Sequence, residues 1–219
     1  MTANGANTLS VTLEPEQIER LFTREDGTFQ FARWGRPIVP VIFGVEEQSL
    51  PPLKGAIETI VAMVGHQMAE TDPELGTNLM VFMLKDWEEL SELDGLDQMI
   101  PELGALVPRL QAAKATQYRA FRFDEYGAIR AVFVFLRMTG QMATRPAEDI
   151  GLELALKSIL DWGPSAFAAR SPLIRGADGI ARLHPDFAAV AQAAYDPVLP
   201  PEARDPSHAL RIFARLQQN

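Results

Sequence analysis

The sequence predicts a single α+β domain in which long helices pack against a mixed sheet of four or five strands. Apolar residues recur at helical spacing over residues 49–71 and 148–162, and short runs rich in β-branched and aromatic residues lie between them. No stretch between these segments is long enough to serve as a domain boundary. We therefore expect residues 1–8 to be a flexible N-terminus and residues 9–219 to form one domain.

The expected elements follow one another along most of the chain. In order, they are a helix at 12–23, strands at 29–34 and 37–45, the long helix at 49–71, a strand at 78–85, short helices within 86–114, a hairpin at 116–138, and helices at 148–162, 185–195 and 205–217. Thr12 and Ser49 are candidate N-caps. Pro37 and Pro40 place the first half of their strand at an edge or a bulge. Gly127 supplies the backbone freedom that a tight hairpin turn requires.

Composition excludes several functional classes. The 219 residues carry a formal net charge of -9, which argues against binding to the phosphate backbone of nucleic acids. The sequence contains no cysteine, which excludes disulfides, thiolate metal sites and cysteine nucleophiles. It has neither a membrane-spanning apolar stretch nor a secretory signal, so we expect a cytoplasmic protein with no membrane partner. The P-loop, G-x-G-x-x-G and G-x-S-x-G motifs are absent as well, and no cofactor is expected.

The three histidines are not expected to bind a metal. His66 and Glu70 stand four residues apart, and on the long helix they would share a face opposite the apolar stripe, pointing toward solvent. His184 is expected to lead into a helix, with Asp186 favoured by the positive end of the helix dipole. His208 is expected on the surface of the last helix.

Arginines interleave with aromatic residues in the first strand of the hairpin. Arg119 shares a strand face with Phe121 and Phe123, whereas Arg122 points the other way. Such a face can hold an anionic ligand, so Arg119 and Arg122 are candidate ligand-binding residues. The same pattern fits a solvent-facing sheet surface on which arginine stems cover aromatic rings, and this second interpretation is preferred.

The helix at 148–162 carries a charged ridge. Asp149, Glu153 and Lys157 recur at four-residue steps, on the side away from an apolar stripe. Glu153 and Lys157 are the candidate catalytic residues, because a carboxylate beside an amine can do acid–base work. The preferred alternative is a charge pair exposed to solvent.

Much of the chain resembles a family of mostly secreted bacterial proteins of unknown function that is grouped with zincin-type metallopeptidases. The similarity spans most of residues 33–200 and includes the early strands at 33–44 and 78–83. In the C-terminal half the matching positions are Glu153, Leu160, Ser165, Phe167, Leu183, Asp186, Tyr195, Asp196, Pro197 and Leu199. The resemblance implies a zincin-like order of elements, with residues 148–162 in the place of the active-site helix.

The same helix departs from the zincin pattern at the positions that bind metal. A zincin needs two histidines one turn apart and a neighbouring glutamate that polarises water. With Glu153 matched to that glutamate, the two ligand positions hold Leu152 and Leu156, which cannot bind zinc. The family's cysteines are missing too, in keeping with a location inside the cell.

Three functions remain open. The preferred one is a non-catalytic, zincin-like domain that binds a protein or small-molecule partner. The second is a hydrolase or transferase that uses Glu153 or the hairpin arginines in a cleft, and it predicts a raised pKa for Glu153. The third is a structural subunit that forms homo-oligomers through its apolar C-terminal helices.

Overall fold

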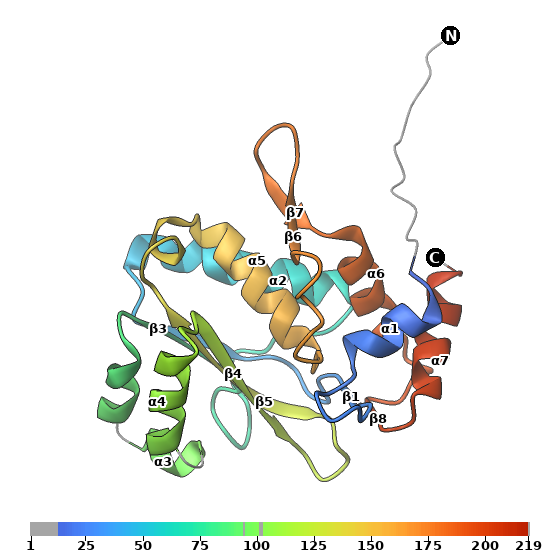
Figure 1. The fold of residues 1–219 in the computed structure, drawn as a ribbon, viewed down its shortest axis with the longest axis horizontal. Helices are drawn as coiled ribbons and strands as arrows, with labels where there is room; N and C mark the ends of the chain where they lie inside the picture. Colours follow the sequence, from blue (N-terminus) through green and yellow to red (C-terminus); the bar gives the residue numbers. More distant parts are fainter. Residues whose placement is uncertain (1–12, 94, 101–102, 219) are drawn as a thin grey trace.

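A mixed four-stranded sheet lies at the centre of the computed structural model, which describes residues 13–93, 95–100 and 103–218 (Figure 1). In spatial order its strands are β2 (Pro40–Phe43), β3 (Leu79–Leu84), β5 (Ile129–Arg137) and β4 (Gln117–Phe123). The β2–β3 and β3–β5 pairs are parallel, and β4 closes the sheet antiparallel to β5. This mixed sheet confirms the predicted fold class. The expected flexible stretch 1–8 and the candidate cap Thr12 lie outside the described residues.

Helices cover both faces of this sheet, giving three layers (Figure 1). One face packs against α2 (Leu50–Met63) and α5 (Ala147–Ile159). The other face packs against η2 (Trp87–Glu92), α3 (Leu96–Met99) and α4 (Leu103–Ala112). Because side chains alternate across a strand, β3 contributes Val81 to the first core and Phe82 to the second.

The remaining elements lie around this sheet and the helices that cover it. They are α1 (Pro15–Leu21), β1 (Phe31–Ala32), η1 (Glu47–Ser49), η3 (Met142–Thr144), β6 (Leu173–Arg175), β7 (Ala181–Leu183), α6 (Pro185–Ala194), β8 (Glu202–Ala203) and α7 (Ser207–Leu216). β1 pairs with β8, and β6 pairs with β7 in a hairpin that projects from the body beyond α5 (Figure 1). α1, α6 and α7 lie together, so the two ends of the described chain meet in one layer.

Local signals set most helix boundaries close to those expected, but the caps and ends of α1 and α2 differ. α1 is capped by Glu14, whose side chain and that of Gln17 form a reciprocal capping box. Ser49 makes no side-chain cap and belongs to η1. The long helix ends at Met63, because Gly65, which follows the C-cap residue Val64, adopts a φ of 69°.

Two close contacts fix the position of α5. A Cβ on Gly151 of α5 would lie 2.7 Å from Cβ of Ala56 on α2, so these two helices pack at the distance that only glycine permits. Trp34 is fully buried between the sheet and α5, and its indole donates a hydrogen bond to the carbonyl of Ser158 at 2.8 Å. Within the described residues, no helix is both long and apolar enough to cross a bilayer.

Candidate ligand-binding site

The charged ridge of α5 faces protein. Asp149 and Lys157 are each only 6% exposed, and the side chain of Glu153 is 16% exposed. Asp149 forms an ion pair with Arg175 of the β6–β7 hairpin, which leans over the start of the helix. The expectation of a solvent-exposed charge pair at Glu153 and Lys157 was therefore wrong, because segments distant in the sequence cover this side of α5.

Glu153 is held by two cations. Its Oε2 accepts from Arg145 at 2.7 Å, and its Oε1 forms an ion pair with Lys157 one turn further along α5. Burial by itself would raise the pKa of this carboxyl, but Lys157 and Arg145 hold the pKa below its ordinary value. The raised pKa that the hydrolase hypothesis predicted is thus contradicted.

The two candidate arginines of the hairpin lie on opposite faces of the sheet. Arg119 points with Phe121 toward α5 and is half-buried. Arg122 points to the other face, where its guanidinium contacts the carbonyl of Met99 and lies 5.8 Å from the ring centroid of Phe133. The preferred interpretation of a solvent-facing sheet surface therefore fits neither arginine, because Arg122 is partly buried beside α3 and Arg119 faces α5.

Arg119 is a cation without a carboxylate partner among the residues that the structure describes. Its guanidinium donates to Oε1 of Gln117 at 3.0 Å and makes no ion pair there. Burial lowers the pKa of Arg119 to about 10, against an opposing effect of Glu153. Burial also lowers the pKa of Lys157, opposed by Glu153 and reinforced by Arg119. The neighbourhood therefore concentrates positive charge that Glu153 only partly neutralises.

These two cations line a cavity of about 330 Å³. The cavity lies beside β4, the C-terminal end of α5 and the segment 161–167 that follows α5. Three aromatic side chains contribute to its wall, namely Phe121, Trp162 and Phe167, whereas the ring of Tyr118 lies on the opposite face of the sheet and stacks on Phe135. The ring centroid of Phe167 lies 5.3 Å from Nζ of Lys157, a cation–π distance.

The segment 161–163 is fastened to the N-terminal part of the chain. The amide of Asp161 donates to the carbonyl of Ala32 at 3.0 Å, and the amide of Gly163 donates to Leu21 at 2.7 Å. A Cβ at Gly163 would lie 2.5 Å from the carbonyl oxygen of Thr23, so a glycine is required for this approach. The cavity wall is thus held in place by backbone contacts.

Asp161 supplies a buried carboxylate at the same wall. Its Oδ2 forms an ion pair with Arg24 and accepts a hydrogen bond from Nε2 of Gln30 at 2.8 Å. Burial raises the pKa of Asp161, and Arg24 opposes the shift. Its Oδ1 accepts no hydrogen bond from any described residue.

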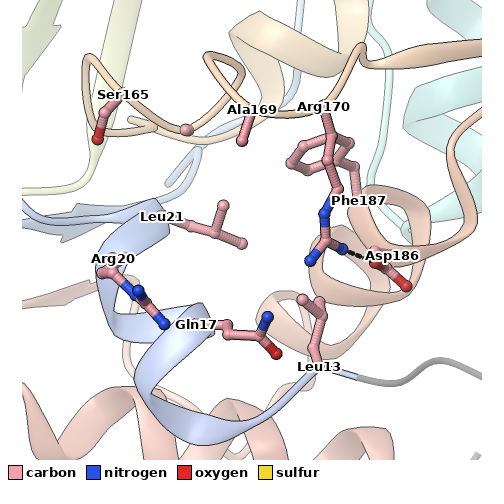
Figure 2. Close-up of a pocket in the computed structure, with 10 residues that line it drawn as sticks. Leu13, Gln17, Arg20, Leu21, Ser165, Ala169, Arg170, Asp186 and Phe187 are labelled. Carbon is pink, nitrogen blue, oxygen red and sulfur yellow. Dashed lines mark hydrogen bonds and ion pairs between the residues drawn. The ribbon is translucent and has the colours of Figure 1, made fainter.

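A second cavity of about 240 Å³ lies on the other side of this segment, between α1 and α6. Figure 2 shows Arg20 and Gln17 of α1 on one side of it and Arg170, paired with Asp186, on the other. Gln17 is engaged in the capping box and Arg20 is exposed. Because none of these charges is both buried and unpaired, the cavity beside Arg119 is the stronger candidate site.

The histidines have structural surroundings. His66 is half-buried beyond the end of α2, where Nε2 lies 2.9 Å from the carbonyl oxygen of Arg36, so it does not share a helix face with Glu70. His184 leads into α6, as predicted, and its side chain also accepts a hydrogen bond from the amide of Asp186. His208 is 1% exposed, which corrects its expected surface position. No cluster of three metal-ligating side chains occurs in the described ranges.

The sequence pointed to Arg119 and Lys157 but not to the rest of the cavity. Arg24 and Asp161 are 137 residues apart along the chain, and neither belongs to a motif. Trp162 carried no signal beyond ending a helix, and Phe167 stood out only as a position of the family resemblance.

Comparison with known proteins gives no match, whether with family models, with curated proteins or with solved structures.

Proposed function

We propose that this protein binds a ligand bearing a carboxylate or phosphate group in the cavity beside Arg119. The observation that carries the proposal is a half-buried guanidinium that lacks an ion pair with any described residue and lines a cavity together with Lys157. An uncompensated buried cation is costly, and a bound anion would relieve that cost through charge-assisted hydrogen bonds.

The contacts of Glu153 favour binding over catalysis. Both carboxylate oxygens are engaged by cations, and its pKa is lowered, so the group stays ionised and paired. We propose that it positions Lys157. A non-catalytic role also fits the zincin resemblance, because Leu152 and Leu156 occupy the positions where a zincin would need its metal-binding histidines.

The oligomer hypothesis has less support. The apolar side chains of α6 and α7 that suggested an interface, such as Phe187, Val190 and Ile212, are buried within the same chain. Light scattering at high protein concentration tests whether the chain self-associates.

Arg119→Met is expected to weaken binding of inorganic phosphate and acetate by roughly 10- to 100-fold, since a charge-assisted contact contributes about 1.5–3 kcal/mol. Binding is measured by NMR chemical-shift titration of the labelled protein. Methionine keeps the apolar stem, and because it removes an unpaired cation the variant is expected to be at least as thermally stable as the wild type.

Arg122→Met is the matched control, since it makes the same change on the same strand but on the opposite face. It is expected to leave the titration unchanged. Equal weakening in both variants, or no saturable binding to the wild type, would overturn the proposed function.

A further inference from the structure

The wall of the cavity contains more than its cations, and the remaining groups restrict the body of the ligand. This inference rests on the proposed function, because it describes the rest of the molecule whose anionic group Arg119 and Lys157 would hold.

Aromatic rings make up much of the apolar wall. Trp162 and Phe167 meet edge to face with ring centroids 5.4 Å apart, and Phe121 approaches from β4. Trp162 cannot easily turn away, because its indole donates to the carbonyl of Leu156 at 2.8 Å and its ring stacks on Phe22 at 5.3 Å. Fixed rings of this kind favour a flat ligand, which gains edge-to-face and stacking contacts that an alkyl group lacks.

A hydrogen-bond acceptor lies in the same wall. The two hydrogen bonds that reach the carboxylate of Asp161 both go to Oδ2, from Arg24 and Gln30. The other oxygen, Oδ1, accepts no hydrogen bond from a described residue, and it is not fully enclosed by protein atoms. Since Asp161 lines the cavity, this oxygen can accept a hydrogen bond from a molecule inside it.

The size of the cavity agrees with a small ring compound. A volume of about 330 Å³ is at the lower end of the range for small-molecule sites. We infer that the ligand is an aromatic carboxylate with a hydroxyl or amino substituent. Its anionic group lies at Arg119 and Lys157, its ring against Trp162 and Phe167, and its donor group at Asp161.

The test measures the binding of a series of probes by isothermal titration calorimetry and by tryptophan fluorescence. Of the three tryptophans only Trp162 lines the cavity, because Trp34 and Trp87 are buried elsewhere. The probes are acetate, cyclohexanecarboxylate, benzoate, the three hydroxybenzoate isomers and their methoxy counterparts. Benzoate is expected to bind about tenfold tighter than cyclohexanecarboxylate, and one hydroxybenzoate roughly five- to tenfold tighter than its methoxy counterpart.

Phe167→Leu is expected to remove most of the preference for benzoate over cyclohexanecarboxylate, while acetate binding persists. Phe123→Leu changes a neighbouring ring that does not line this cavity and is the control. If acetate and phosphate bind but benzoate binds no tighter than cyclohexanecarboxylate, or no hydroxyl isomer exceeds its methoxy counterpart, the inferred ligand class is wrong while the proposed function stands. If no probe and no phosphate binds, both fail.

Discussion

Replacing Gly151 with leucine is expected to destabilise the protein by about 3 kcal/mol or more, because the new side chain has no space between the two helices. A single Cβ at this position would already lie 2.7 Å from Cβ of Ala56 and 3.1 Å from the carbonyl oxygen of Leu53. The two helices would have to separate, and α5 would lose contacts with the apolar core that it shares with α2 and the sheet. Chemical denaturation with a two-state fit measures the change in the free energy of unfolding.

A pair of alanine substitutions tests the same contact with matched chemistry. Gly151→Ala is expected to destabilise by roughly 1–3 kcal/mol, through overpacking. Gly55→Ala, in the partner helix α2, places a methyl group where no atom lies within 4 Å and is expected to stabilise by about 0.5–1 kcal/mol, through helix propensity. Equal effects of the two alanines would contradict the close approach of α2 and α5.

Lowering the pH from about 6.5 to 4 is expected to reduce stability by roughly 3 kcal/mol through His208. This imidazole packs against Phe31 with ring centroids 4.4 Å apart, and neither ring nitrogen has a hydrogen-bond partner within the described part of the chain. Burial, with Arg211 and Arg33 adding to it, lowers the pKa of His208 to about 4. The unfolded chain binds this proton at a higher pH than the folded protein does. The contribution of neutral His208 to the free energy of unfolding is therefore fully present above about pH 6.5 and is lost as the pH falls toward 4.

His208→Phe isolates this effect. The phenyl ring keeps the contact with Phe31 and removes two unpartnered nitrogens, so the variant is expected to be more stable at pH 7 and to lose less stability on acidification. The wild type and the variant are compared by thermal unfolding at half-unit pH steps. His66, whose pKa burial also lowers, is present in both proteins and cancels in the difference. Parallel pH profiles would show that His208 is not the group responsible.

The elements that the sequence predicts correctly are those set by local signals. The hairpin forms where expected because two β-branched and aromatic runs flank Gly127, which adopts a φ of 80°. β3 is the apolar strand buried on both faces, and β2 lies at the edge as its prolines require. The region 86–114 forms short helices, as Gly95 and Pro101 predict, but Pro108, which was also expected to break a helix, lies inside α4.

The candidate site was predictable only in part. Strand alternation correctly separates Arg119 from Arg122, but it cannot say which face a helix will cover. The apolar residues of α5 likewise predict which side of the helix packs on the core, but they do not predict whether the charged side is exposed or buried. Lys157 and Glu153 became buried because β4 and the segments after β5 and α5 close around them, and none of these contacts has a local signature.

From the amino-acid sequence alone follow the fold class, the strands of the central sheet and most of the helices. The tertiary structure decided which charged side chains leave water. Arg119 of β4 and Lys157 of α5 line one cavity. Asp161 lines the same cavity and forms an ion pair with Arg24, which follows α1. The physical reason is that secondary structure depends on neighbours within a few residues, whereas the burial of a charge depends on long-range packing that no short stretch of sequence contains.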